Sequence, residues 1–315
     1  MVNISIVIPL YNKEFSICKT IEAVLAQTYT HFEIIIVNDG STDHSYEVAK
    51  KFKDERIKII SKENGGVSSA RNLGIKMAQY DHIAFLDADD YWDHNYLSEM
   101  SIAINKFPSA LMYYCPHEYI DKKGICHSTK IKSLEEKYMG LISIFNYSQE
   151  EGPWTSATII KKTTESQLFL FDEDFTMGED IDLWIRIALK GEVVIVNKAM
   201  SHYNLNAENR LMTKPTEESK CLIMNLGKYR KIELTVPDFK RYLDKIRMSH
   251  IKNYLIGNTR EVREIDTFLA EIDLDNFSFF WRIIRILPDS MRGVFFRTSF
   301  YSNILLHRIF FIKEK

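Results

Sequence analysis

Apolar and polar residues follow one another in blocks along the first part of this chain, and the blocks predict strands and helices in turn. Short apolar runs rich in β-branched residues predict buried strands at residues 4–8, 32–37, 57–60 and 82–86. The segments between them predict three helices. These lie at residues 17–25, from the turn at residues 38–43 up to about residue 52, and at residues 70–79. Alternating strands and helices are typical of a parallel sheet with helices on both faces. We therefore expect an α/β fold with a mostly parallel central sheet.

The pattern becomes weaker beyond residue 92. It predicts helices at residues 96–107 and from residue 179, and strands at residues 111–115, 158–160 and 192–196. A turn is expected at residues 121–124, and the polar stretch from there to about residue 149 indicates no element. From about residue 215 to residue 271 the chain is rich in helix formers of mixed charge. We expect one α/β domain over residues 1–212 and a helical C-terminal extension over residues 213–315.

Three of the predicted strands end in polar residues. The first is followed by Pro9–Asn12, the second by Asn38–Gly40 and the fourth by Asp87–Asp89. In open α/β sheets, ligands bind in the crevice beyond the carboxyl ends of the parallel strands. The sequence therefore predicts a binding site to which all three loops contribute.

The most concentrated charge in that site is the acidic run Asp87-Ala88-Asp89-Asp90. Carboxylates this close repel one another unless a positive charge lies between them. Mg²⁺ and Mn²⁺ prefer carboxylate oxygens and leave coordination positions open for substrate phosphates. The run therefore predicts a divalent cation that holds a phosphate-bearing ligand. The alternative is a polar loop that caps the helix predicted after Trp92.

Composition narrows the classes of protein that need to be considered. The 315 residues are 45% hydrophobic and 27% charged with a net charge of −2, which is ordinary for a globular protein and gives no sign of a nucleic-acid partner. The four cysteines include no Cys-x-x-Cys pair, so we expect neither a zinc site nor a disulfide framework. No apolar run reaches the ~18 residues of a membrane span, and no signal-peptide pattern precedes the first strand. A cytoplasmic location is expected.

Four motifs together resemble the successive signatures of the family 2 glycosyltransferases of bacterial glycan assembly. They are Val7-Ile8-Pro9-Leu10-Tyr11-Asn12, Val37-Asn38-Asp39-Gly40-Ser41-Thr42-Asp43, Gly65-Gly66-Val67-Ser68-Ser69-Ala70-Arg71-Asn72 and Asp87-Ala88-Asp89-Asp90. The resemblance implies a GT-A fold, with a nucleotide-binding half over residues 1–92 and an acceptor-binding half over residues 93–212. Asn38 departs from the family, which usually has a further Asp at that position.

The resemblance also implies roles for individual residues. The donor-binding residues would be Pro9, Tyr11, Glu14, Asp39, Arg71, Asp87, Ala88 and Asp89. Among them, Asp39 would hydrogen-bond the base and Arg71 would lie near the base or the diphosphate. Asp89 would be the main ligand of Mn²⁺ or Mg²⁺, with Asp87 beside it and His202 as a further metal or phosphate ligand; a lone histidine is otherwise more often structural.

A second motif, Gly178-Glu179-Asp180 followed by Leu183-Trp184-Ile185-Arg186, resembles the catalytic-base motif of the same family. Without the resemblance, Glu179 and Asp180 are acids in the first turn of a helix, where the helix dipole favours them. With it, Asp180 would take the proton of the attacking acceptor hydroxyl. One base opposite one leaving group means in-line attack and inversion. Nearby, Trp154 would either stack on an acceptor sugar or pack in the protein.

The resemblance thus predicts an inverting, metal-dependent hexosyltransferase. It would move one sugar from a nucleotide-diphosphate sugar, with UDP favoured, to a hydroxyl of a glycan or a polyisoprenoid-linked oligosaccharide in surface polysaccharide assembly. The Gln-x-x-Arg-Trp motif of processive synthases does not occur, which favours transfer of a single sugar. The alternatives are a nucleotidyltransferase and a non-catalytic module that binds a nucleotide sugar.

The C-terminal stretch from Phe277 to Lys315 interleaves aromatic residues with arginines. Such a composition on amphipathic helices favours an interfacial membrane site, which would place the enzyme at the inner face of the cell membrane. A helical lid or a homodimer contact is the alternative. The sequence leaves both open.

Overall fold

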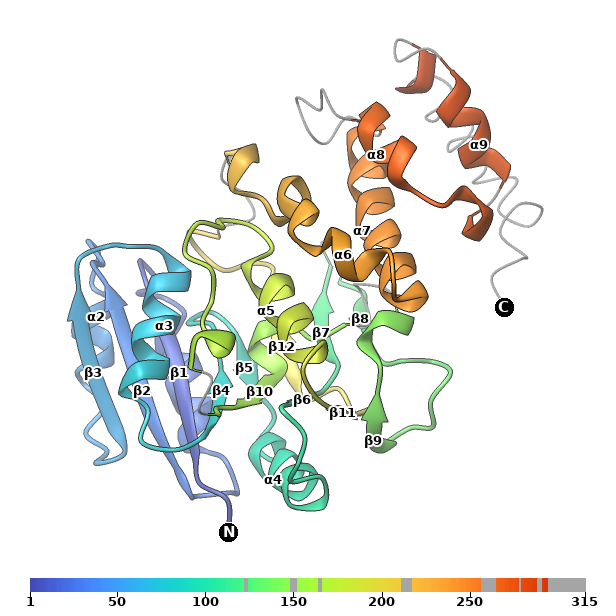
Figure 1. The fold of residues 1–315 in the computed structure, drawn as a ribbon. Helices are drawn as coiled ribbons and strands as arrows, with labels where there is room; N and C mark the ends of the chain where they lie inside the picture. The colour runs from blue at the N-terminus through green and yellow to red at the C-terminus, as the bar shows by residue number, and fades with distance from the viewer. Residues whose placement is uncertain are drawn as a thin grey trace. The chain divides into compact units, whose positions relative to one another are not determined.

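The computed structural model describes residues 1–121, 124–147, 152–163, 166–210, 217–255, 265–277, 279–287 and 291–293. The chain divides into two compact units, residues 1–225 and residues 226–315. The first unit contains the motifs that resemble a nucleotide-sugar site. Figure 1 shows its strands and helices in blue to yellow.

The first unit is built on a large sheet with the strand order β3-β2-β1-β4-β10-β6-β11-β9. Its strands are β1 (Ile4–Leu10), β2 (Phe32–Asp39), β3 (Ile57–Lys62), β4 (His82–Phe85), β6 (Met112–Tyr114), β9 (Met139–Ile142), β10 (Thr158–Lys161) and β11 (Val193–Val196). Strands β3, β2, β1 and β4 are parallel. Strand β10 runs antiparallel to β4 and β6, and β11 is parallel to β6 but antiparallel to β9. The prediction of an α/β fold with a mostly parallel sheet is confirmed.

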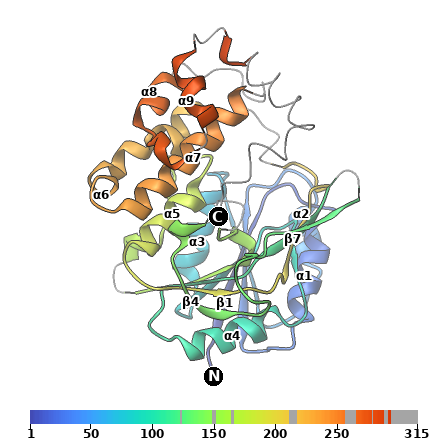
Figure 2. The same ribbon diagram turned by 90° about the vertical axis from the view of Figure 1, so that its right-hand side faces the viewer.

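Helices cover both faces of this sheet because successive strand residues point to opposite sides. On one face, Ile6 and Ile8 of β1 belong to the core that α1 (Ile17–Leu25) and α4 (Tyr96–Lys106) also line. On the other face, Ile35 and Val37 of β2 pack against Ala70 of α3 (Val67–Met77). Figure 2 shows α1 and α3 on opposite sides of the strands. The short helix α2 (Ser45–Ala49) contacts α1.

A smaller sheet lies beside the carboxyl end of β4, with the order β5-β12-β7-β8. Its strands are β5 (Tyr91–Trp92), β12 (Ser201–Tyr203), β7 (His117–Ile120) and β8 (Cys126–Ser128). Three of them flank the site: β5 follows the acidic run directly, β12 pairs with β5, and β7 pairs with β12. The sequence pattern had indicated no element between residues 125 and 149, where the structure has β8 and β9.

The topology brings the predicted loops to one edge. Because β1, β2 and β4 are parallel neighbours, Leu10 lies opposite Asn38, and Val7 lies opposite Phe85. The segments that follow these three strands therefore begin at the same rim. Helix α5 (Glu179–Ala188) also starts in the first unit, and its first turn carries Glu179 and Asp180.

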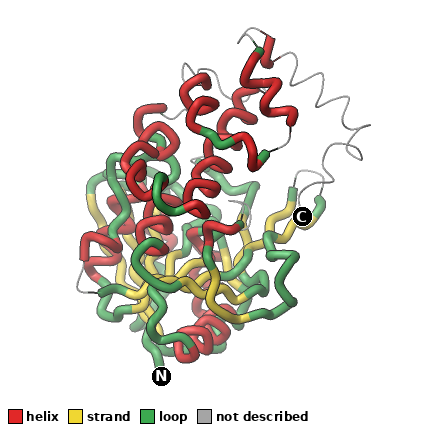
Figure 3. The backbone as a smooth tube through the Cα atoms, turned by 45° about the vertical axis from the view of Figure 1, so that its right-hand side comes forward, coloured by secondary structure: helices red, strands yellow, loops and turns green. Residues whose placement is uncertain are grey.

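The described secondary structure of the second unit is helical, and its helices are red in Figure 3. They form α6 (Arg230–Glu233), α7 (Pro237–Leu255), α8 (Ile265–Glu271) and α9 (Phe279–Ile286). The Arg247 guanidinium is 1% exposed and lies 2.7 Å from Glu233 and 3.1 Å from Asp244, while its Nε lies 3.0 Å from Glu271. This buried ion cluster joins α6, α7 and α8, and it confirms a helical C-terminal region.

Most residues of the predicted membrane or dimer contact lie outside those described. The aromatic residues of that stretch beyond residue 293 are Phe295, Phe296, Phe300, Tyr301, Phe310 and Phe311. Within the described ranges, no helix has both the length and the apolar character needed to cross a bilayer.

Candidate functional site

The acidic run after β4 is partly buried, with the side chains of Asp87 and Asp89 27% and 13% exposed. Asp90 is 1% exposed, and its carboxylate accepts hydrogen bonds from the Ser156 hydroxyl (2.6 Å) and the Asn204 amide (3.1 Å). Burial, with Asp89 and then Asp87 adding repulsion, raises the pKa of Asp90 to about 8. Burial also raises the pKa of Asp89, although Lys13 opposes the effect. The run is therefore a place where negative charge is poorly solvated.

A lysine that the sequence analysis did not assign compensates part of that charge. The Lys13 ammonium lies 2.6 Å from Asp89 Oδ2, and it also donates to the carbonyl of Glu208. Lys13 belongs to the loop after β1, so this ion pair connects the loops that follow β1 and β4. The Asp89 carboxylate is thus next to a positive charge supplied by the protein itself.

Arg71 joins the acidic run to the predicted base motif, Gly178-Glu179-Asp180. Its guanidinium donates to Asp87 Oδ1 (2.8 Å) and to Glu179 Oε1 (3.0 Å). Burial would lower the pKa of Arg71, but Asp87 and Glu179 outweigh it and raise the pKa. For Glu179, burial and the Asp180 charge raise the pKa in spite of Arg71. One buried arginine therefore places the two motifs, which are far apart in sequence, in a single site.

Asp180, the predicted base, is held by two hydrogen bonds. Its Oδ2 accepts from the Thr155 hydroxyl (2.9 Å), and its Oδ1 accepts from the Ile181 amide (2.7 Å). The helix begins after Gly178, which has φ +79° and whose missing Cβ would lie 2.9 Å from the Cβ of Leu222. Glycine is needed there because other residues are strained at positive φ. The glycine of the motif thus sets the direction in which α5 presents Asp180.

Asp39, predicted to bind the base, uses most of its hydrogen-bonding capacity within its own loop. Oδ1 accepts from Lys62 Nζ (2.7 Å) and the Gly65 amide (3.0 Å), and Oδ2 accepts from the Gly66 amide (2.9 Å). Each carboxylate oxygen has two lone pairs, so one on Oδ2 remains for a ligand. These bonds hold the Gly65-Gly66 turn at the rim, beside the start of α3. Base binding by Asp39 stays a prediction.

The other predicted donor-binding residues come from the same rim. Pro9 is in β1, opposite Val37 of β2. The Tyr11 carbonyl accepts a hydrogen bond from Asn209 (3.4 Å), and Glu14 accepts one from the His44 amide (3.0 Å). The Ala88 carbonyl accepts from the Thr20 hydroxyl of α1 (3.0 Å). The structure thus collects these residues around one edge of the sheet.

His202 has partners of its own beside the site. Its Nε2 lies 2.8 Å from Asp93 Oδ1, and its ring stacks on Tyr91 with centroids 4.7 Å apart. Within the described ranges, no group of three or more His, Cys, Asp or Glu side chains is arranged to hold a metal ion. The role of His202 as a ligand stays a prediction.

Trp154 has aromatic neighbours that favour packing over sugar stacking. Its ring centroid is 5.0 Å from that of His117 and 4.6 Å from that of Tyr203, and its indole N–H lies 3.4 Å from Asp90. These contacts attach the turn before β10 to the small sheet. The stacking of Trp154 on an acceptor sugar stays a prediction.

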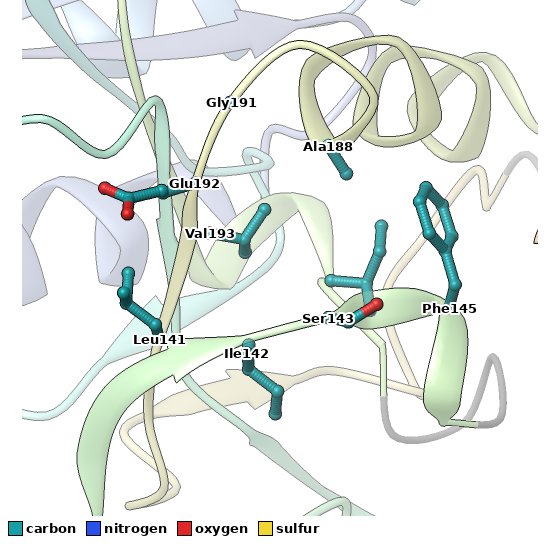
Figure 4. Close-up of a pocket in the computed structure, with 9 residues that line it drawn as sticks. Leu141, Ile142, Ser143, Phe145, Ala188, Gly191, Glu192 and Val193 are labelled. Atoms are coloured by element: carbon teal, nitrogen blue, oxygen red, sulfur yellow. The ribbon is translucent and has the colours of Figure 1, made fainter. Parts of the chain in front are cut away.

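A separate pocket of about 330 Å³ lies at the far edge of the large sheet (Figure 4). It is lined mainly by apolar residues of β9 and the segment after it, with Ala188, Gly191, Glu192 and Val193 on the other side. None of the predicted site residues lines it, so it is not part of the candidate active site.

Comparison with known proteins identifies the family of this chain. Residues 5–171, more than half of the chain, match the family described as Glycosyl transferase family 2. The chain belongs to this family. It is 32% identical over 280 residues to an uncharacterised glycosyltransferase of Rickettsia conorii. This match covers 88% of this chain and 44% of that protein. It is also 32% identical over 191 residues to WfaP of Escherichia coli, named UDP-Glc:alpha-D-GlcNAc-diphosphoundecaprenol beta-1,3-glucosyltransferase, covering 60% of this chain and 71% of WfaP.

Among solved structures, residues 1–349 of S. aureus TarS in complex with UDP-GlcNAc superpose with a TM-score of 0.64 at 15% identity. The match covers 94% of this chain and 88% of that one. It supports the GT-A fold predicted for this family 2 member. The chain spans less than half the length of the first curated relatives that it matches.

Sequence reasoning missed three residues of the site. Lys13 pairs with Asp89, Thr155 donates to Asp180, and Ser156 donates to Asp90 while accepting from the Asp87 amide (3.1 Å). A positive charge in the loop after the first strand was a usable signal for Lys13. Thr155 and Ser156 had no such signal, because small hydroxyl residues are common in loops.

Proposed function

We propose that this chain transfers a single sugar from a UDP-sugar to a hydroxyl of a glycan or of a lipid-linked oligosaccharide, with inversion and with the help of Mn²⁺ or Mg²⁺. One observation carries the proposal. Arg71 binds Asp87 and Glu179 at once, so the acidic run and the base motif face the same small region. A donor held at the first and an acceptor held at the second would meet there.

The residues present fit a divalent cation. Asp87 and Asp89 offer carboxylate oxygens, and Asp89 already has an ammonium at 2.6 Å, so this position favours positive charge. Mg²⁺ is usually bound through one or two carboxylates together with substrate phosphates, so a cluster of three side-chain ligands is not required. Asp89 and Asp87 would hold the ion. When bound, it would act as a Lewis acid that neutralises charge on the leaving diphosphate.

The proposed reaction is a single displacement. The acceptor oxygen forms a bond to the anomeric carbon while the bond from that carbon to the phosphate oxygen breaks, and UDP leaves with the electron pair. Asp180 takes the proton of the acceptor hydroxyl. Attack from the side opposite the leaving group inverts the anomeric carbon. Arg71 orients Asp87 on the donor side and Glu179 on the acceptor side through its two hydrogen bonds.

The choice of UDP and of a lipid-linked acceptor rests on the family membership and on the name of WfaP. Both substrates are inferred from this relative, whose match covers 60% of this chain.

The test is a product assay with Mn²⁺, a panel of UDP-sugars that includes UDP-glucose, and α-GlcNAc-diphosphoundecaprenol. We expect a glycosylated lipid whose new linkage is β when the donor is α-linked, together with one UDP per product. Asp89→Ala should abolish transfer and metal-dependent donor binding, while Asp180→Asn should bind donor but not transfer. Retention of configuration, or normal transfer by Asp180→Asn, would contradict the proposal.

A further inference from the structure

The turn before β10 touches both halves of the candidate site. Strand β10 runs antiparallel to β4, with Ile159 opposite Ala84, so the start of β10 lies beside the end of β4 (Figure 1). The residues just before β10 therefore reach the acidic run. Two consecutive hydroxyl residues occupy this turn, Thr155 and Ser156, and they are 3% and 0% exposed.

These two hydroxyls point to different parts of the site. Ser156 donates to Asp90 Oδ2 (2.6 Å) and accepts from the Asp87 amide (3.1 Å), so it serves the acidic run. Thr155 donates to Asp180 Oδ2 (2.9 Å), so it serves the base motif. The turn cannot shift without moving one of these contacts, and it therefore fixes the position of Asp180 relative to the acidic run.

We infer that Thr155 is a positioning residue for transfer, which acts by fixing the plane of the Asp180 carboxylate. This inference rests on the proposed role of Asp180 as the base. An Asp side chain turns about two torsions, and its terminal torsion is soft. The Ile181 amide holds Oδ1, and the Thr155 hydroxyl holds Oδ2. With both bonds, one lone pair of Oδ2 keeps a fixed direction toward an acceptor hydroxyl.

Helix capping does not account for the Thr155 bond. Gly178, the residue before α5, has no side chain with which to cap the helix, and the Asp180 carboxylate satisfies the Ile181 amide through Oδ1 alone. Oδ2 is not needed for that purpose. Its bond to Thr155 instead crosses from α5 to the turn before β10, 25 residues away in sequence.

The test compares Thr155→Val, which removes the hydroxyl at nearly constant volume, with Thr155→Ser, which keeps it. The assay follows UDP release from UDP-glucose with Mn²⁺, both with α-GlcNAc-diphosphoundecaprenol and with water as the acceptor. We expect Thr155→Val to lower kcat by about 10- to 100-fold, because misplacing a reacting group by about 1 Å can reduce the rate 100-fold. Donor binding should stay unchanged, and Thr155→Ser should recover most of the rate.

Thr158→Val is the matched control. The Thr158 hydroxyl is also buried and donates to the Trp154 carbonyl (2.7 Å), but it does not contact Asp180. We expect this control to lower the melting temperature while keeping more than half of the wild-type kcat. A similar loss of kcat in Thr158→Val and Thr155→Val would overturn the inference, and so would full activity of Thr155→Val.

A crystal structure of each Thr155 variant gives a readout that does not depend on turnover. We expect the Asp180 carboxylate in more than one orientation in Thr155→Val and in one orientation in Thr155→Ser. A single unchanged orientation in Thr155→Val would overturn the inference even if no donor is turned over. Normal transfer by Asp180→Asn would instead reject the proposed base, and the two failures are therefore distinguishable.

Discussion

The Nζ atom of Lys13 lies 2.6 Å from Oδ2 of Asp89, and the two side chains are only 11% and 13% exposed. An ammonium group thus lies against the carboxylate that is expected to be the main metal ligand. A divalent cation that binds Asp89 has to compete with this ammonium. We therefore expect Lys13 to weaken the binding of a metal ion at Asp89 before the donor arrives.

Lys13→Met should strengthen Mn²⁺ binding in the absence of donor. The substitution leaves Asp89 without its nearest positive charge while Asp87 and Asp90 remain close, so a cation is favoured more. We expect the Kd for Mn²⁺ to fall roughly 10-fold, which corresponds to about 1.4 kcal/mol. Calorimetric titration with MnCl₂ measures this. Lys62→Met is the control, because it removes an ammonium from Asp39 instead; an unchanged or weaker affinity in Lys13→Met would refute the competition.

Because Asp90 is buried with a raised pKa, we expect an unusual dependence of the free energy of unfolding on pH. Its pKa is raised from an ordinary value near 3.8 to about 8, so the folded protein keeps a proton that the unfolded chain loses. The free energy of unfolding should therefore fall as the pH rises from about 4 to about 8, by up to ~1.4 kcal/mol per pH unit from this group. The loss is complete above the folded pKa.

Asp90→Asn isolates that effect, because asparagine does not ionise. Its carbonyl oxygen can accept from the Asn204 amide while its NH2 group donates to the Ser156 hydroxyl oxygen. Thermal unfolding with EDTA between pH 5 and pH 9 should show a flatter profile than the wild type, and a higher melting temperature at pH 9. Asp93→Asn, at a side chain that is 41% exposed, should leave the profile unchanged. Parallel profiles for Asp90→Asn and the wild type would show that Asp90 does not carry the effect.

Gly178 predicts a link between backbone strain and activity. Gly178→Ala places a Cβ at φ +79° and 2.9 Å from the Cβ of Leu222, just before the helix turn that carries Asp180. The left-handed conformation alone should lower the free energy of unfolding by roughly 1–2 kcal/mol, and the close contact should lower it further. Relief of the contact displaces the start of α5 and with it Asp180. The rate of transfer should therefore fall even under conditions where the variant is fully folded.

Gly124→Ala provides a comparison at the same φ of +79°, because the described residues beyond its chain neighbours have no atom within 4 Å of the added Cβ. Its free energy of unfolding should fall only by the cost of the left-handed backbone conformation, and it should keep full transfer activity. Urea unfolding and the UDP-release assay measure both quantities. Equal effects of the two alanine substitutions would mean that the contact with Leu222 does not matter.

How much the sequence predicts depends on whether a feature is local. Strands β1, β2 and β4 are continuous apolar runs followed by polar loops, so their positions and the rim that they share follow from pattern and from the rules for parallel sheets. Strands β5, β7 and β8 have only two to four residues and include polar side chains, so periodicity does not detect them. They form because β12 pairs with both β5 and β7, and β7 pairs with β8.

The same distinction holds within the site. The acids Asp87, Asp89, Glu179 and Asp180 were found because they occur in dense motifs. The contacts that hold them come from residues distant in sequence, such as Lys13, 76 positions from Asp89, and Thr155, 25 positions from Asp180. Which hydroxyl or ammonium reaches a given carboxylate is decided by the crossing of strands, and a single sequence does not contain that information in local form.

Glu208 predicts how the segment after β12 is attached to the donor side. Its carboxylate accepts hydrogen bonds from the amides of Phe15 (3.1 Å) and Ser16 (3.1 Å) and from the Ser16 hydroxyl (2.6 Å), at the start of α1. Burial raises the pKa of Glu208, but these hydrogen bonds outweigh it, and the net pKa is lowered. The ionised form therefore stabilises the attachment, and this stabilisation is lost as the pH falls through the lowered pKa.

Glu208→Ala should release the Phe15 amide without unfolding the unit. A hydrogen bond to a charged acceptor contributes about 1.5–3 kcal/mol, so the hydrogen-exchange rate of this amide should rise by at least 10-fold at neutral pH. Glu14→Ala is the matched control, because Glu14 accepts from the His44 amide across the same rim. In that variant the His44 amide should exchange faster and the Phe15 amide should not. If the Phe15 amide exchanges at the same rate in Glu208→Ala and the wild type, the segment after β12 is not attached through Glu208.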